Sequence, residues 1–286
     1  MAEALARAAL AGNPSDGYGG AVLAVTIPAF VAEVELIEAG GASTGSPLEL
    51  IDATLARFER EFGSGAEVAR WHTSIPRSVG LGGSSAIVIA TLRALSELNA
   101  VELGPDALAE LALSIERDDL GISAGLQDRI AQSYGGLTFM DFSDPPIYER
   151  LHPELLPSLL VAWRAHAAAS SSVVHSDLRA RYDRGETAVR DAMHELGELA
   201  RSARGALNYG DHERLARCAD ASFDVRERIM ELDPRHVEMV KVGRAAGAGV
   251  NYTGSGGAVV CICEDSAHRL AVADALQAAD CETVDL

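Results

Sequence analysis

The chain has 286 residues, of which 48% are hydrophobic and 23% charged, so it can bury a sizeable core. Its formal net charge of -18 argues against a general nucleic-acid or anionic-membrane binder, which would need a basic surface. A few local arginines can still bind a small anion. Lys241 is the only lysine, and it does not follow a glycine-rich loop, so Walker-type P-loop chemistry is excluded.

The first half of the chain mixes strand patterns with separate helix patterns. After a possible strand containing Arg7, the predicted elements are strands at 21–27 and 30–39, a helix at 46–63, a strand at 67–76, helices at 84–99 and 104–119, and a strand at 135–142. Residues 143–158 then contain four prolines, which predicts a domain boundary near residue 150.

The second half predicts a separate domain over residues 151–286. Its elements are a strand at 159–165, helices at 186–208, 211–232 and 234–246, two strands joined by a glycine turn at 249–263, a helix at 266–279 and a strand at 282–286. The element order predicts an α+β protein of two domains, each with helices stacked on a mainly antiparallel sheet.

Cysteine use and the start of the chain indicate the compartment. Cys261 and Cys263 lie two residues apart in an apolar run, so they are predicted to face the same side of a core strand rather than to bind a metal. No disulfide framework is implied. No basic segment followed by a long apolar stretch opens the chain, and no uncharged apolar run approaches the ~20 residues of a membrane span. We therefore expect a cytoplasmic protein.

A glycine-rich segment stands directly before the predicted helix at 84–99. Glycines let backbone amides turn toward one point, and the N-terminus of a helix adds unpaired N–H groups and partial positive charge, which together favour phosphate binding. The alternative is an ordinary helix start capped by serine. The candidate phosphate-binding residues are Gly80, Leu81, Gly82, Gly83, Ser84, Ser85 and Ala86.

Three other segments contain candidate site residues. Thr253–Ala258 is a glycine turn between two strands, either a simple hairpin turn or a loop against a ligand. Residues 12–22, which include Asp16, have the composition of a turn. Glu116 lies near a helix end and Asp128 near the start of the next helix. A lone acid of this kind is usually a solvated group or a cap, but two close to a phosphate-type loop are candidates for metal binding and for accepting a hydroxyl proton.

In this order the segments resemble the GHMP family of small-molecule kinases, which includes galactokinase, homoserine kinase, mevalonate kinase and phosphomevalonate kinase. Residues 76–86 match the family's phosphate loop, with one extra glycine before the serines. Residues 123–128 and 135–136 match a second motif, again with one inserted residue, and residues 253–258 match the closing motif. The likeness spans nearly the whole chain.

The opening motif and two other stretches point to one branch of the family. Asn13 and Pro14 replace the Glu-His pair of galactokinase-like members, while the surrounding spacing is kept at Arg7, Leu10, Gly12, Asp16, Gly19 and Gly20. Residues 12–20, 75–88 and 171–182 resemble the glucuronokinase-like branch more than galactokinase or mevalonate kinase. The resemblance implies a two-domain fold, with an N-terminal domain like domain 2 of ribosomal protein S5 and a ferredoxin-like C-terminal domain.

The resemblance also implies a reaction, phosphorylation of the anomeric hydroxyl of glucuronic acid or a related sugar by ATP. It implies that the Gly80–Ala86 loop binds ATP and that Mg²⁺ is held by Glu116 and Ser85, although the extra glycine leaves Ser84 open as the ligand. Asp128 would accept the proton of the attacking hydroxyl, and Arg7 would lie near the transferred phosphoryl group. Asp16 and the loop residues Gly254, Ser255 and Gly256 would contact the sugar.

A sugar acid also requires a cation for its carboxylate, and the sequence does not select one. The candidates are Arg77, Arg129, Arg179 and Arg181, with His175 and Ser176 as further substrate contacts and Trp71 and Tyr18 as stacking residues. A kinase for a mevalonate-like acid or alcohol, and a non-catalytic nucleotide- or sugar-binding regulator, stay open as alternatives. So does the oligomeric state, monomer or homodimer.

Overall fold

The computed structural model describes residues 1–38, 48–63, 65–164 and 171–286, with only the backbone described for residues 171–176. Contacts divide the chain into two compact units, each assembled from several segments. Unit 1 comprises Met1–Ala6, Thr26–Ile75 and Gly82–Gly135, and unit 2 comprises Arg7–Val25, Pro76–Leu81 and Gly136–Leu286. The predicted boundary near residue 150 falls inside unit 2, where β5 and a short 3₁₀ turn occupy the proline-rich segment.

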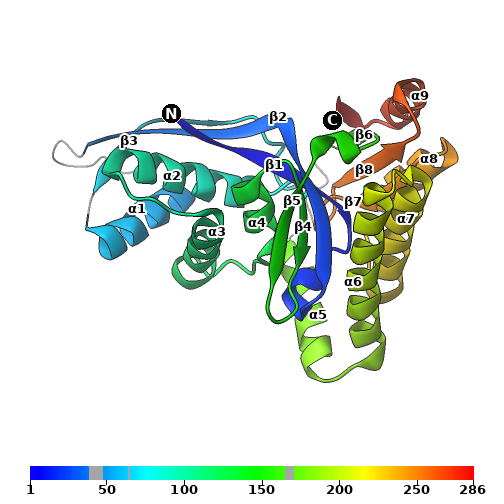
Figure 1. Cartoon of the computed structure of the whole chain (residues 1–286), viewed down its shortest axis with the longest axis horizontal. Coiled ribbons are helices and arrows are strands. Elements are labelled where there is room, and N and C mark those ends of the chain that lie inside the picture. The colour runs from blue at the N-terminus through cyan, green and yellow to red at the C-terminus, as the bar shows by residue number, and fades with distance from the viewer. Residues whose placement is uncertain (39–47, 64, 165–170) are drawn as a thin grey trace. The chain divides into compact units, whose positions relative to one another are not determined.

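The elements follow in the order shown in Figure 1. They are β1 (Ala2–Ala11), η1 (Ser15–Tyr18), β2 (Ala21–Glu38), α1 (Glu49–Phe62), β3 (Ala66–Thr73), α2 (Gly83–Asn99), α3 (Pro105–Ser114), η2 (Ile115–Asp119), α4 (Gln127–Tyr134), β4 (Leu137–Asp141), β5 (Ile147–Leu151), η3 (Pro153–Leu155), β6 (Ser158–Trp163), α5 (Ser171–Asp183), α6 (Thr187–Asn208), α7 (His212–Ile229), α8 (Pro234–Ala245), β7 (Gly249–Tyr252), β8 (Ala258–Cys263), α9 (Ser266–Gln277) and β9 (Glu282–Asp285).

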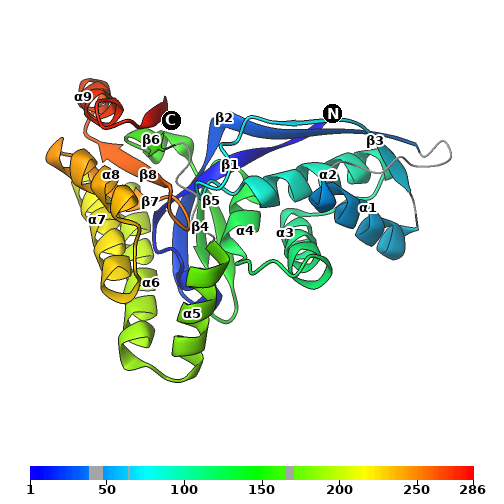
Figure 2. The same cartoon turned by 180° about the vertical axis from the view of Figure 1, so that it is seen from behind.

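In unit 1, helices pack beside an antiparallel pair of strands. The second half of β2 pairs with β3, from Ala32 opposite Thr73 to Glu38 opposite Ala66. Helix α1 buries Ile51, Thr54 and Phe58, which recur at helical spacing along one face. Figures 1 and 2 show α1 beside α2, and α2 is buried along most of its length because it also packs against α3, α4 and β3.

Strand β2 joins two stretches that the sequence predicts as separate strands, 21–27 and 30–39. β2 runs without interruption from Ala21 to Glu38, although Pro28 lies inside it and lacks a backbone N–H. Pro28 is exposed and falls between the part of β2 that pairs with β4, which ends at Val25, and the part that pairs with β3, which begins at Ala32. The proline therefore removes no hydrogen bond from either of these ladders. The whole sheet has the order β1-β2-β4-β5, with β3 also paired to β2.

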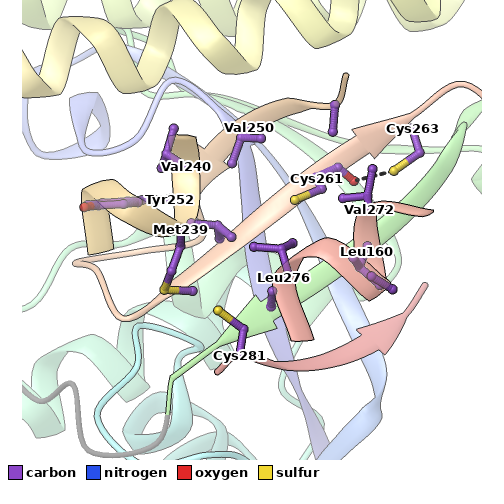
Figure 3. Close-up of a cluster of buried hydrophobic side chains, with 14 of the residues drawn as sticks. Leu160, Met239, Val240, Val250, Tyr252, Cys261, Cys263, Val272, Leu276 and Cys281 are labelled. Carbon is purple, nitrogen blue, oxygen red and sulfur yellow. Dashed lines mark hydrogen bonds between the residues drawn. The ribbon is translucent and has the colours of Figure 1, made fainter. Parts of the chain in front are cut away.

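In unit 2, a four-stranded sheet of order β7-β8-β6-β9 is covered by helices α7, α8 and α9. Its registered pairs are antiparallel, as predicted. Cys261 and Cys263 both lie in the apolar cluster shown in Figure 3, which confirms that they face a core. Burial raises the pKa of the Cys261 thiol, as expected of a core residue. All four cysteines are free and buried.

Three helices of unit 2 begin where an aspartate precedes the apolar pattern. The side chains of Asp211, Asp233 and Asp265 accept backbone N–H groups two or three residues ahead, at 2.8–2.9 Å, and so cap α7, α8 and α9. The predicted starts of these helices are confirmed to within a residue. Helix α5 (Ser171–Asp183) is an element that the sequence did not predict.

Candidate active site

The N-terminus of α2 has the backbone arrangement that the glycine pattern predicts. Gly82 precedes the helix with a φ of 73°, a conformation that favours glycine, and no side chain caps the first turn. The hydroxyl of Ser85 turns back to donate to the Gly82 carbonyl at 3.0 Å. Ser85, which we predicted as a metal ligand, therefore binds the chain's own backbone, and the uncapped helix terminus presents the amides and partial positive charge that suit a phosphate.

Ser84, rather than Ser85, lies against the predicted metal-binding acid. The Ser84 hydroxyl donates to Oε1 of Glu116 at 3.0 Å. Glu116 is fully buried, and its Oε2 accepts two hydrogen bonds from Arg129, one of them from Nε at 2.7 Å. A buried carboxylate needs such a partner, because the cost of removing an unpaired charge from water is several kcal/mol. The ion pair fixes Glu116 beside the start of α2.

Local backbone geometry directs Glu116 inward. The predicted helix at 104–119 is two elements, because α3 ends at Ser114 and continues as the single π-helical turn η2, which carries Glu116. Such turns are frequent at functional sites. Arg57 and Arg60 bind the neighbouring acids Asp118 and Asp119 on the exposed side of the turn.

Helix α4 brings the predicted base to the same region of unit 1. Its first turn contains Asp128, whose carboxylate lies 3.8 Å from Nη1 of Arg129 and is 19% exposed. One turn further on, the side-chain amide of Gln132 donates to the carbonyls of Gly82 and Leu5, at 2.9 Å each. Gln132 thereby ties α4 to the loop before α2. Ser84, Glu116, Arg129 and Asp128 form one connected group, which we call the acid cluster.

In unit 2, Arg7 binds two glycine-rich segments. Its Nη1 donates to the carbonyl of Gly80 at 2.7 Å and to that of Thr253 at 2.8 Å. The Thr253 hydroxyl also donates to the Gly80 carbonyl, at 3.1 Å. Arg7 is 4% exposed, so in this structure its guanidinium holds the Gly80 segment against the Thr253–Ala258 loop. Its predicted place beside a phosphoryl group stays a prediction.

Gly254 is required by the close approach of these two segments. A Cβ atom at this position would lie 2.3 Å from the Gly80 carbonyl oxygen and 3.0 Å from Nη2 of Arg7. We expect Gly254→Ala to lower the free energy of unfolding by about 1–3 kcal/mol, because the backbone must separate to relieve the overlap. Urea unfolding measures this.

A matched control for Gly254 is Gly205→Ala in α6, where a Cβ would meet open space. That substitution should stabilise the protein by roughly 0.5–1 kcal/mol through helix propensity. Equal stability of the wild type and Gly254→Ala would show that the two segments do not pack as described.

The predicted substrate residues have different surroundings. Asp16 is half-buried in η1. Asn13, which with Pro14 replaces the family's Glu-His pair, is buried; its side-chain amide donates to the Tyr252 carbonyl, and its Oδ1 accepts from Nδ2 of Asn251. Arg77 is exposed, and none of the described residues pairs with it. The side chains of His175 and Ser176 lie outside the described residues.

The other arginines proposed for a carboxylate are already paired. Arg129 binds Glu116 and the Gly125 carbonyl. Arg179 pairs with Asp183 and stacks over Tyr18, and Arg181 makes two hydrogen bonds to Glu186. Their geometry therefore gives no support to a role in binding a substrate carboxylate, and leaves Arg77 as the candidate among the four.

Sequence reasoning missed one buried cation. Arg226 in α7 is 1% exposed, and its Nη2 donates to the Gly254 carbonyl at 2.8 Å. The signal was present, because Leu215, Ala219, Ser222, Arg226 and Ile229 recur at spacings of three and four and form the buried face of the helix. An arginine on that face is unusual.

Comparisons with known proteins match both halves of the chain. The model of the GHMP kinases N terminal domain matches residues 49–136, and that of the GHMP kinases C terminal domain matches residues 188–281. Glucuronokinase 1 of Arabidopsis thaliana is 34% identical over 310 residues, covering 93% of this chain and 85% of that protein. Probable glucuronokinase 2 of the same plant is 38% identical over 213 residues, covering 70% of this chain and 58% of that protein.

A solved structure shows the same fold. The D-glycero-D-manno-heptose 1-phosphate kinase of Bacteroides thetaiotaomicron has a TM-score of 0.74 at 24% identity, covering 99% of this chain and 94% of that one. The chain therefore belongs to the GHMP kinase family, with its two-domain fold of mixed helices and sheets, and is an ATP-dependent kinase. The family predicted from the motifs is confirmed.

Two further observations concern the described residues alone. No group of three or more His, Cys, Asp or Glu side chains among them is arranged to hold a metal ion. None of the helices within the described ranges has both the length and the apolar character that crossing a bilayer requires.

Proposed function

We propose that this protein is a sugar kinase that transfers the terminal phosphoryl group of ATP to the anomeric hydroxyl of glucuronic acid or a related sugar. The observation that carries the proposal is the acid cluster, in which the buried Glu116 carboxylate lies at the uncapped start of α2 and is linked through Arg129 to the candidate base Asp128. Phosphoryl transfer needs positioning and charge neutralisation more than covalent chemistry, and these groups supply both. The relatives named glucuronokinase support the choice of sugar.

The acid cluster suits a magnesium ion that arrives with nucleotide phosphates. Mg²⁺ takes oxygen ligands and usually keeps one or two protein ligands, with phosphates and water completing its coordination. The Ser84 hydroxyl and Oε1 of Glu116 are such a pair, 3.0 Å apart, while Arg129 holds the second carboxylate oxygen. When bound, the ion would neutralise charge on the phosphate oxygens. We therefore assign the metal to Ser84 and Glu116, replacing Ser85.

Asp128 is the proposed base. Its partly exposed carboxylate, 3.8 Å from Nη1 of Arg129, would accept the proton of the attacking hydroxyl. The amides from Gly82 to Ser85 would bind phosphate oxygens. Asp16 would bind sugar hydroxyls, and Arg77 would bind the carboxylate of a sugar acid. We place this small-molecule substrate in the cytoplasm; the net charge of -18 does not exclude a small anion, because local arginines can bind it.

A panel of coupled ATP-turnover assays tests the substrate. We expect glucuronate to give the highest kcat/KM, at least tenfold above glucose, galactose and mevalonate, and phosphorus NMR to identify the product as the sugar 1-phosphate. Robust activity on mevalonate with none on sugar acids would contradict the proposal. ATP binding without transfer to any compound in the panel would favour a non-catalytic regulator instead.

A further inference from the structure

Arg226 is a buried cation with unused donors beside the Thr253–Ala258 loop. Its Nη2 binds the Gly254 carbonyl, while Nε and Nη1 are buried and have no hydrogen-bond partner among the described residues. Its guanidinium lies 5.2 Å from the ring centre of Tyr252, whose hydroxyl is likewise buried and unpaired within the described chain. Several donors are thus left without acceptors in one place.

A second guanidinium lies next to the first. Arg7 and Arg226 both contact Gly254, because Arg226 binds its carbonyl oxygen and a Cβ at that position would lie 3.0 Å from Nη2 of Arg7. Burial, with a further contribution from the charge of Arg7, lowers the pKa of Arg226 to about 10, so it is still charged at neutral pH. Tyr252 cannot neutralise it, since burial raises the pKa of the phenol.

The arrangement is costly for a purely structural residue. A buried charge ordinarily has a counter-ion, and no ion pair joins Arg226 to a carboxylate of any described residue. Two guanidinium groups that share Gly254 also repel each other. One hydrogen bond to a carbonyl and the contact with the Tyr252 ring offset these costs only in part, whereas an oxyanion accepting from an unpaired donor of Arg226 would offset both.

We infer that Arg226 binds an oxyanion of the substrates, either the carboxylate of the sugar acid or a phosphoryl oxygen of ATP. The inference rests on the proposed function and adds to it a binding residue from α7. Arg226 is buried in this structure and binds the Gly254 carbonyl, so binding a ligand requires the Thr253–Ala258 loop to shift. Gly256 and Gly257 in that loop have positive φ values, and glycine gives the backbone freedom to move.

The test compares Arg226→Met with Arg226→Lys, and with Arg217→Gln as the control. Arg217 lies on the same helix, but it is exposed and paired with Glu213. Methionine fills similar space without the charge. We expect Arg226→Met to melt at the wild-type temperature or about 2–8 °C above it, because an unpaired buried charge has been removed. The KM of Arg226→Met for whichever substrate carries the bound oxyanion, glucuronate or ATP, should rise at least tenfold, and Arg226→Lys should recover part of the loss.

Ligand protection in thermal melting identifies the oxyanion. If glucuronate no longer raises the melting temperature of Arg226→Met while a non-hydrolysable ATP analogue still does, Arg226 binds the sugar carboxylate. If only the ATP analogue loses its effect, Arg226 binds the phosphoryl group. Unchanged KM values and unchanged protection in Arg226→Met would overturn the inference and leave the kinase assignment intact. So would a proportional loss of protection by glucuronate, the ATP analogue and a neutral sugar, since that would indicate a structural role. If Arg226→Met does not fold, the same comparisons on Arg226→Lys decide the question.

Discussion

Replacing Asp128 by asparagine is expected to lower kcat by more than 10²-fold while leaving the melting temperature within a few degrees of the wild type. The amide has the shape of the carboxylate but cannot accept a proton at neutral pH. Asp128 is 19% exposed, and asparagine keeps its size and shape, so we expect the fold to tolerate the change. Steady-state turnover of ATP with saturating glucuronate measures the effect.

The control for Asp128 is Asp118→Asn in the neighbouring π turn. Its side chain is 67% exposed and pairs at 3.4 Å with Arg57, away from the acid cluster. We expect turnover within about twofold of the wild type for this variant, because surface ion pairs of this kind contribute little. If Asp128→Asn kept wild-type turnover, Asp128 would not be the base, and the non-catalytic alternative would gain support.

Removing the Glu116 carboxylate is expected to have the largest effect on stability. Glu116→Ala should lower the free energy of unfolding by about 3–5 kcal/mol, because it leaves the buried guanidinium of Arg129 without its counter-ion. Turnover should also be lost, since the proposed metal ligand is gone. Urea unfolding and ATP turnover measure the two effects separately.

A double variant separates charge burial from catalysis at this pair. Glu116→Ala combined with Arg129→Met removes both charges, so we expect it to recover most of the lost stability and none of the turnover. Glu110→Ala, an exposed position on α3, should change neither. If the double variant were as unstable as Glu116→Ala alone, the loss would come from packing rather than from the unpaired Arg129 charge.

Local sequence signals predicted much of the fold because they act over a few residues. Three helices begin directly after an aspartate that caps the first turn, namely Asp211, Asp233 and Asp265. The alternation of Cys261 and Cys263 with residues on the opposite face predicted a core strand, and both lie in the core cluster of Figure 3. The glycine-serine segment predicted the helix that starts at Gly83.

The hydrogen-bond partners of the site residues could not be predicted from the sequence, because they depend on tertiary contacts. Nothing in the order Ser84-Ser85 says which hydroxyl faces Glu116, 32 residues away in the chain. Arg129 was predicted as a candidate for binding a substrate carboxylate, but in the structure it binds the carboxylate of Glu116. The apolar spacing of α7 indicated which positions are buried, yet the contact of Arg226 with Gly254 required the folded chain.

A crystal structure with a non-hydrolysable ATP analogue and Mg²⁺ tests the central claim most directly. The account predicts phosphate oxygens within hydrogen-bond distance of the amides from Gly82 to Ser85, and a metal ion bound by Ser84 and Glu116. A nucleotide bound elsewhere, with those amides occupied by side chains and Glu116 bound only to Arg129, would contradict it.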